Sequence, residues 1–370
     1  MDNRRLQALH DAGQSIWLDY IDRTMLHNGD LKRRLTDDVL TGMTSNPTIF
    51  QKALAEGDAY DAQLRAAPAS LETRQLFELV ETDDVRQACD IFADVYHRTG
   101  GGDGYVSIEV SPGVANDATA SVEEARRLWQ TVDRPNLLVK IPGTQEGAKA
   151  VRQLISDGIN VNITLLFAVE AYERVIDAYI DGLEARVQNG KPIDAIASVA
   201  SFFVSRVDTE VDKRLEAIGG SARQLEGRAA IANAKMAYQL FLTRFGGSRW
   251  QALEKLGARV QRPLWASTST KNPAYRDVVY VESLIGPDTV NTIPPRTIED
   301  FRDHGVVART VDANVEQSRA DLDSLAKAGI DMHDVTDTLL REGISSFEKS
   351  FATLSDGIRT KVAQLRQSAA

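Results

Sequence analysis

Short apolar runs alternate with longer amphipathic segments along most of the chain. Eight of the runs are short and rich in apolar residues, and most are apolar throughout. This pattern is typical of parallel strands that are buried on both faces. The predicted strands cover residues 15–20, 42–45, 105–110, 137–141, 160–165, 195–202, 263–267 and 289–293.

The segments between these strands carry helix signals. Residues 169–187 place apolar side chains at helical spacing, and residues 209–217 and 226–245 are interpreted as further helices. Ser121 and Glu124 fit a capping box, which predicts that another helix begins there. Strands and helices therefore alternate along the chain.

Eight strand–helix units with no linker between them favour a closed barrel over an open doubly wound sheet. The predicted fold class is α/β, a (β/α)8 TIM barrel with extra N-terminal and C-terminal helices. We expect all 370 residues to form one barrel domain.

The last part of the chain has a different pattern, and we expect residues 311–370 to form a helical extension packed on the barrel. Steps of three and four residues predict one apolar stripe on a long helix. Such a helix could pack on the barrel wall, or it could close over the mouth of an active site. The stripe consists of Phe347, Phe351, Leu354, Ile358, Val362 and Leu365.

Composition excludes several classes of protein. The sequence has 43 basic and 53 acidic residues, a net charge of −10, which argues against a general nucleic-acid-binding protein. A single cysteine, Cys89, excludes a disulfide framework, and the five histidines show no metal-ligand spacing. No apolar run is long enough to cross a membrane, and no signal core follows the N-terminus. We expect a cytoplasmic protein that needs neither a metal nor a cofactor.

Reactive residues of a barrel lie at the C-terminal ends of its strands. Lys140 lies near the end of the apolar run 137–141. A lysine is costly to bury as a cation, and burial favours the neutral amine, which is the form that attacks a carbonyl. Lys140 is therefore a candidate for forming a Schiff base. The alternative is a lysine whose amine extends to solvent at the strand end.

Two carboxylates lie on the third and the first predicted strands. Glu109 shares one strand face with Ser107 and Tyr105, and Asp19 lies near the end of the first strand. A carboxylate at a strand end can act as a general acid or base, or can hold a reacting water. An ion pair to a neighbouring cation is the alternative for Glu109.

The fifth predicted strand carries a polar face. Asn160, Asn162 and Thr164 alternate along it, and polar side chains inside a core need hydrogen-bond partners. This stripe indicates a site better than any single member does. Asn46, in a Ser-Asn-Pro segment after the second strand, also fits an ordinary turn or helix start.

The last strands are followed by cations. Arg206 follows the sixth strand, and Lys271 follows the seventh together with small hydroxyl residues such as Ser269. Barrels often bind phosphate after their late strands, and hydroxyl groups beside a cation suit phosphate oxygens. Either cation alone could equally be a solvated surface charge.

Three of these segments together resemble the transaldolase family, whose members are Schiff-base enzymes of the class I aldolase type with a (β/α)8 barrel. They are TSNPTIF at residues 44–50, LVKIPGT at 138–144 and GINVNITLLF at 158–167. The resemblance covers roughly residues 15–300.

The resemblance implies a catalytic role for four residues. Lys140 would form the Schiff base with a ketose phosphate, and Asp19 would handle the proton of the C4 hydroxyl. Glu109, with Thr164, would hold the water used in imine formation and hydrolysis.

The remaining site residues are implied to bind substrate. Asn46 and Asn162 would bind hydroxyl groups and the dihydroxyacetone enamine, and Ser201 and Phe203 would line the pocket. Arg206, Ser269 and Lys271 would hold the phosphate group, although many family members carry arginine where Lys271 stands. Lysine keeps the charge but lacks the planar two-pronged grip of arginine.

The leading functional hypothesis is transfer of dihydroxyacetone from sedoheptulose 7-phosphate to glyceraldehyde 3-phosphate, by a monomer or a homodimer. The nearest alternative is a fructose-6-phosphate aldolase, which releases free dihydroxyacetone. Such aldolases typically carry glutamine and tyrosine where Glu109 and Phe203 stand, which favours the transferase. A non-catalytic barrel that binds sugar phosphates is a third hypothesis.

Overall fold

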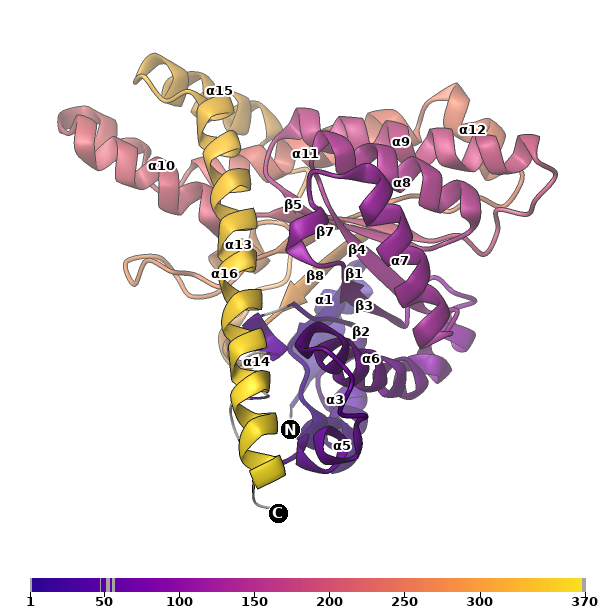
Figure 1. Cartoon of the computed structure of the whole chain (residues 1–370). Coiled ribbons are helices and arrows are strands. Elements are labelled where there is room, and N and C mark those ends of the chain that lie inside the picture. Colours follow the sequence, from indigo (N-terminus) through magenta and orange to yellow (C-terminus); the bar gives the residue numbers. More distant parts are fainter. Residues whose placement is uncertain (1, 47, 51–53, 55–56, 368–370) are drawn as a thin grey trace.

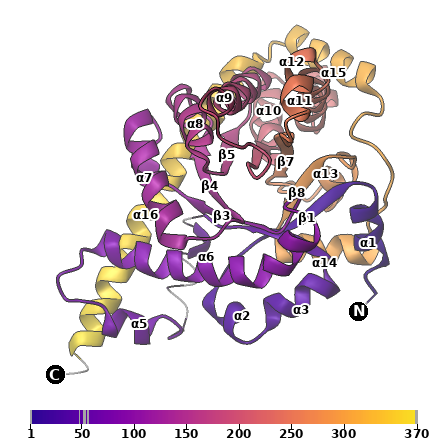
Figure 2. The same cartoon turned by 90° about the vertical axis from the view of Figure 1, so that its right-hand side faces the viewer.

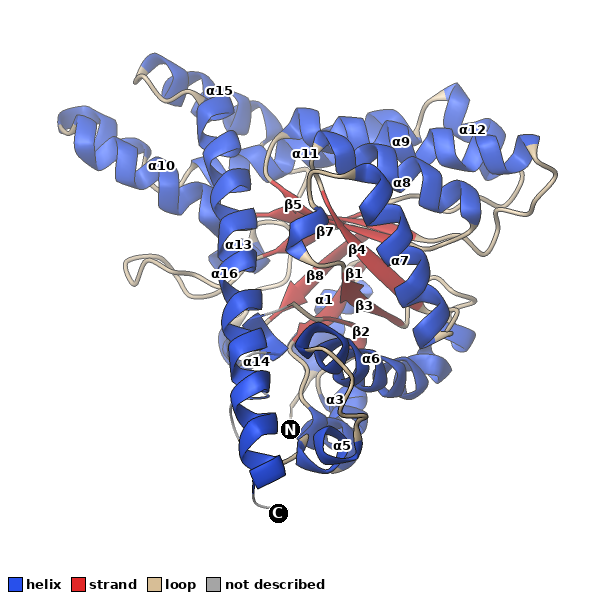
Figure 3. Ribbon diagram, viewed as in Figure 1, coloured by secondary structure: helices blue, strands red, loops and turns tan. Residues whose placement is uncertain are grey.

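Eight parallel strands form a closed barrel, with each strand paired to its neighbours in sequence and β1 paired to β8. The computed structural model describes residues 2–46, 48–50, 54 and 57–367. Figure 3 shows the strands enclosed by helices. The predicted (β/α)8 barrel is confirmed. The strands are β1 (Gln14–Asp19), β2 (Leu40–Thr44), β3 (Tyr105–Glu109), β4 (Leu137–Pro142), β5 (Val161–Leu166), β6 (Ser198–Phe203), β7 (Arg262–Ala266) and β8 (Thr289–Ile293).

All eight predicted strands are present. Their bounds differ from the expected ones by at most three residues, and the largest difference is at β6, which begins at Ser198 rather than at residue 195. The strands lie within one continuous apolar core that runs from Leu6 to Leu365. This continuity supports the expectation of one domain, which stays a prediction. Residue 47 of the 44–50 segment and residues 368–370 of the predicted extension lie outside the described residues.

Helices surround the barrel and extend it at both ends of the chain (Figure 1). An N-terminal helix, α1, precedes β1, and two helices, α15 and α16, follow the last barrel helix. The α-helices are α1 (Arg4–Asp11), α2 (Arg23–His27), α3 (Asp30–Asp37), α5 (Asp61–Ala66), α6 (Thr73–Arg98), α7 (Ala118–Val132), α8 (Gln145–Asp157), α9 (Val169–Gln188), α10 (Ser205–Ile218), α11 (Ala229–Phe245), α12 (Ser248–Glu254), α13 (Val279–Glu282), α14 (Pro295–His304), α15 (Val315–Lys327) and α16 (Met332–Gln367); the 3₁₀ turns are η1 (Pro112–Val114) and η2 (Gly220–Leu225).

The predicted helices are found, but α10 begins four residues before its predicted start, and the start predicted at Ser121 is wrong. The segment 169–187 corresponds to α9, and α10 and α11 contain most of the other two predicted segments. The capping box at Ser121 does not form, because α7 begins earlier and the Asp117 side chain accepts a hydrogen bond from the backbone N–H of Ala120. The Ser121 hydroxyl instead donates to the backbone oxygen of Val114, at 2.8 Å. An aspartate four residues upstream therefore provides the N-cap.

The long helix α16 packs on the barrel and also crosses its mouth. Figures 1 and 2 show it extending from the side of α15 to α5. Its C-terminal part contacts α5 and α6, and Phe351 meets Phe77 of α6 edge to face at 5.6 Å between ring centroids. Farther back along the helix, Ser346 and Phe347 line a cavity at the strand ends. Both interpretations of the apolar stripe are thus correct, each for a different part of the helix.

Within the described part of the chain, none of the helices combines the length and the apolarity that a membrane-spanning helix needs.

Candidate active site

A cavity of about 420 Å³ lies at the C-terminal ends of the strands, beneath α16. It collects side chains from β1, β2, β4, β5 and β6 and from the segments that follow β6, β7 and β8. Nine of the eleven predicted site residues line it, namely Asp19, Asn46, Lys140, Thr164, Ser201, Phe203, Arg206, Ser269 and Lys271. The other two, Glu109 and Asn162, lie directly behind residues of this wall.

The centre of the site is a buried ion pair. Lys140 and Glu109 are paired in the register of β3 and β4, so their side chains leave neighbouring strands at the same level. Lys140 Nζ lies 3.0 Å from Glu109 Oε2 and donates a second hydrogen bond, also 3.0 Å, to the backbone oxygen of Ser45. Burial raises the pKa of Glu109, and the neighbouring Lys140 opposes this shift. The amine therefore stays inside the barrel and does not extend to solvent.

One oxygen of this pair and one nearby hydroxyl have no hydrogen-bond partner among the described residues. They are Glu109 Oε1 and Thr164 Oγ1, and both are buried. Thr164 lines the cavity, on the same strand face as Asn162, and β5 becomes irregular directly after it. Leu165 adopts a left-handed φ of 58°, and the pairing with β6 shifts between Ile163 and Leu166. A residue other than glycine in this conformation is uncommon and marks local strain, which often accompanies functional sites.

Asn162 is fully buried and supports the wall from behind. It accepts a hydrogen bond from Ser201 Oγ at 2.7 Å and donates one to Ser107 Oγ at 3.0 Å. Three strands, β3, β5 and β6, are thus joined beneath the cavity by side-chain hydrogen bonds. On the polar face predicted for the fifth strand, Asn160 and Asn162 have the hydrogen-bond partners they require, whereas Thr164 Oγ1 has none among the described residues.

Asp19 lies at the end of β1, on the wall of the cavity. Thr44 donates a hydrogen bond to Asp19 Oδ1 at 2.8 Å, and the Thr44 hydroxyl also lies 2.6 Å from that of Thr292. Burial raises the pKa of Asp19, while the positive charge of Lys140 and the Thr44 hydrogen bond oppose the shift. A carboxylate tuned upward in this way is suited to proton transfer nearer neutral pH.

Two cations lie together at one end of the cavity. Arg206 stacks over the Phe203 ring at 5.1 Å, and Lys271 donates a hydrogen bond to Ser269 Oγ at 2.7 Å. Burial lowers the pKa of both Arg206 and Lys271, and for Lys271 the nearby Arg206 adds to the effect. Neither forms an ion pair with a carboxylate in the described part of the chain. Two cations without a carboxylate partner, in a chain of net charge −10, give this end of the cavity a local positive charge.

Asn46 has the hydrogen bond of a helix-start residue and also lies on the wall of the cavity. Its Oδ1 accepts a hydrogen bond from the backbone N–H of Ile49 at 3.1 Å, as a helix-start residue does, and its side chain also lines the cavity.

Sequence reasoning missed several residues of this wall. Ser346 and Phe347 come from α16, while Thr44, Thr292 and Tyr20 come from the ends of β2, β8 and β1. Phe347 was part of the predicted apolar stripe, but the sequence pattern does not show which part of the molecule that stripe contacts. The two threonines carried a usable signal, since each lies at the end of a predicted strand.

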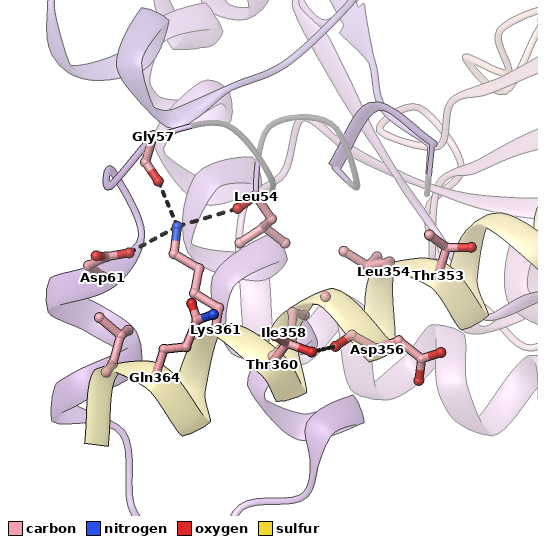
Figure 4. A pocket seen from close by; sticks show the side chains of 12 residues that line it. Leu54, Gly57, Asp61, Thr353, Leu354, Asp356, Ile358, Thr360, Lys361 and Gln364 are labelled. Carbon is pink, nitrogen blue, oxygen red and sulfur yellow. Dashed lines mark hydrogen bonds and ion pairs between the residues drawn. The ribbon is translucent and has the colours of Figure 1, made fainter. Parts of the chain in front are cut away.

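A larger cavity, about 670 Å³, lies between the C-terminal part of α16 and the segment before α5 (Figure 4). Among the described residues that line it, Lys361 is the one lysine, and its Nζ lies 2.7 Å from the backbone oxygen of Gly57 and 2.9 Å from Asp61 Oδ1. That amine holds α16 in place and is engaged with a carboxylate and a carbonyl oxygen. Size alone therefore does not identify the site. Across the residues that the structure describes, no group of three or more His, Cys, Asp or Glu side chains could hold a metal ion.

Fold and site together define a (β/α)8 barrel with a buried lysine beside a carboxylate and two cations at the strand ends. Residues 16–358 match the family described as Transaldolase/Fructose-6-phosphate aldolase, and the chain belongs to that family. A protein of Acidothermus cellulolyticus named Transaldolase is 48% identical over 98% of both chains. Those of Thermobifida fusca, 47% identical over 97% of this chain and 98% of its own, and Trichodesmium erythraeum, 45% identical over 99% of both, carry the same name. These similarities confirm the family resemblance and the expected enzyme class, a transferase of aldehyde or ketone units.

The hydrogen bonds behind the wall predict a stability effect. In a Ser201→Ala variant, the buried Oδ1 of Asn162 loses its donor. Leaving a buried acceptor unpaired costs about 1–3 kcal/mol, so the free energy of unfolding falls by that amount in a denaturant titration. Ser221→Ala, at an exposed serine of η2, serves as the control. Equal stability of the two variants would contradict the prediction.

Proposed function

We propose that this chain transfers a dihydroxyacetone unit from sedoheptulose 7-phosphate to glyceraldehyde 3-phosphate, through a Schiff base on Lys140. The products are erythrose 4-phosphate and fructose 6-phosphate. The single observation that carries the proposal is the buried Lys140 amine, 3.0 Å from a carboxylate and facing the same cavity as the Arg206 and Lys271 pair. A carbonyl compound with a phosphate at its far end matches this arrangement of charges.

The first step joins the Lys140 amine to the ketone carbon of the donor. The amine adds to the carbonyl, and loss of water gives an imine. Glu109 and Thr164 hold that water and return it when the imine is hydrolysed. Their buried oxygens without protein partners, Glu109 Oε1 and Thr164 Oγ1, support this role.

Cleavage of the carbon–carbon bond follows from the electronics of the imine. The protonated imine accepts the electron pair of the breaking bond, so the three-carbon unit remains as an enamine. Asp19 takes the proton of the C4 hydroxyl as the aldehyde product leaves. The enamine then adds to the incoming aldehyde, and Asp19 returns a proton to the new hydroxyl group.

The other site residues position the sugar. Arg206 and Lys271 bind the phosphate group together with Ser269, and Asn46 binds hydroxyl groups of the three-carbon unit. Because Asn162 is fully buried, we propose that it acts through Ser201, whose hydroxyl donates to it and lines the cavity. Phe203 closes the wall beside Arg206 and supports its guanidinium group.

Reductive trapping tests the assignment of the lysine. Borohydride treatment in the presence of fructose 6-phosphate reduces the imine to a stable secondary amine, and peptide mass mapping locates the label. We expect the label on Lys140 and its absence in a Lys140→Met variant. Lys361→Met, at the engaged lysine of the larger cavity, serves as the control and stays labelled at Lys140. Label at any other lysine of the wild type would refute the assignment.

An acceptor-dependence assay separates the two activities of the family. With fructose 6-phosphate alone, a transferase retains the enamine and turns over slowly, and added erythrose 4-phosphate accelerates turnover by at least tenfold. An aldolase releases free dihydroxyacetone at a rate that the acceptor does not increase. Glu109 and Phe203, where fructose-6-phosphate aldolases typically carry glutamine and tyrosine, favour the transferase. Rapid release of dihydroxyacetone without acceptor would overturn the proposed transfer.

The raised pKa of Asp19 predicts the shape of the acid side of the pH profile. Cleavage requires the ionised carboxylate, so the rate rises with pH as Asp19 loses its proton, with a midpoint above the ordinary aspartate value. Asp19→Asn removes the base and lowers kcat by about 10²–10⁴-fold. Asp194→Asn, at an exposed aspartate, keeps the wild-type profile. A profile of Asp19→Asn that matched the wild type would exclude Asp19 as the base.

The non-catalytic alternative, a barrel that only binds sugar phosphates, predicts phosphate binding without trapping at Lys140. The oligomeric state, monomer or homodimer, and the cytoplasmic location stay predictions.

A further inference from the structure

The helix α16 brings one face to the mouth of the site. Gly343, Ser346, Phe347 and Ser350 follow helical steps of three, four and seven residues, so they lie on the same side of the helix. Ser346 and Phe347 line the cavity, and the Ser350 hydroxyl lies 2.9 Å from that of Thr48 in the segment after β2. This contact joins the helix to the segment after β2.

Gly343 places this face close to the positively charged end of the cavity. A β-carbon at that position would lie 3.0 Å from Leu165 Cδ2 and 3.8 Å from Arg206 Nη1. The helix backbone therefore passes directly over the guanidinium group. Ser346 follows three residues later, and residues three apart on a helix lie about 5–6 Å apart. Its hydroxyl is within reach of a phosphate group bound by Arg206.

Three threonines of α16 form a hydrogen bond within the helix, whereas Ser345, Ser346 and Ser355 form none with a described residue; of these three serines, Ser346 is the one that lines the cavity. Thr336, Thr353 and Thr360 each donate to the backbone oxygen four residues earlier, at 2.9–3.0 Å. This is the usual arrangement for a hydroxyl side chain inside a helix. The Ser346 hydroxyl forms no hydrogen bond with any residue that the structure describes, and the side chain is exposed at the cavity. It is left with its donor available to a ligand.

We propose that Ser346 is a substrate-contacting residue that determines specificity for phosphorylated sugars. Its hydroxyl donates a hydrogen bond to the phosphate group held between Arg206 and Lys271, and the absence of a side chain at Gly343 lets α16 approach closely enough for this contact. The inference rests on the proposed sugar-phosphate chemistry. It makes α16, which follows the barrel strands in the sequence, part of the proposed binding site.

The test compares Ser346→Ala with a neighbouring control, Ser345→Ala, which changes a half-buried residue that does not line the cavity. Two quantities are measured on the full chain. The first is the dissociation constant of inorganic phosphate, obtained by calorimetry. The second is the ratio of kcat/KM for glyceraldehyde 3-phosphate to that for unphosphorylated glyceraldehyde.

We expect Ser346→Ala to weaken phosphate binding and to lower the kcat/KM ratio, each by about 3- to 10-fold, as for loss of one hydrogen bond. The loss falls mainly on KM. Ser346→Thr keeps the hydroxyl and restores both quantities to within about twofold of the wild type. If Ser346 had only a structural role, its loss would affect the phosphorylated and the unphosphorylated acceptor alike, and the ratio of their kcat/KM values would not change.

Ser346→Ala and Ser345→Ala with the same phosphate affinity and the same ratio would overturn the inference, and so would a wild type that binds no phosphate. The phosphate measurement does not depend on imine chemistry. A wild type that binds phosphate through Ser346 but traps no sugar at Lys140 would refute the proposed transfer and leave this contact standing.

Discussion

The buried pair of Lys140 and Glu109 is the interaction on which the rest of the site depends. Two charges inside a barrel are costly, and they are tolerated because each satisfies the other at 3.0 Å and because Lys140 also donates to a backbone oxygen. The pair exists because β3 and β4 run parallel in register, which brings residues 31 positions apart to the same level. Every other polar group at the mouth is arranged around that amine.

Closure of the barrel converts separate strand ends into one cavity. Asp19 and Lys271 come from opposite ends of the sequence of strands, yet both line the same wall, because β1 pairs with β8. The closed barrel also places the acidic and the basic side chains of the site on different strands. Carboxylates lie on the side of β1 and β3, and the cations Arg206 and Lys271 follow β6 and β7. This separation fits the proposed substrate, which has a carbonyl group at one end and a phosphate at the other.

The helix α16 completes what the barrel leaves open. Its apolar stripe packs on α5 and α6, and its contact with the loop after β2 holds it across the mouth. The same residues stabilise the fold and limit the volume in which chemistry occurs. Phe347 shows this double role, since it is nearly buried and lines the cavity. A segment predicted from its amphipathic pattern thus also lines the cavity at the strand ends.

Much of the fold and of the candidate site could be predicted from the sequence, because the local pattern of apolar and polar residues decides local structure. Continuous apolar runs identified the eight strands, and polar residues at strand ends identified Lys140, Glu109, Asp19 and Arg206 as candidates. The predicted start of α7 was wrong because Asp117, four residues before Ser121, provides the N-cap. That Asn162 lies behind the wall and that Ser346 lies on it depended on contacts between residues far apart in sequence. Such contacts are set by how the barrel closes and where α16 crosses it, so only the tertiary structure decides them.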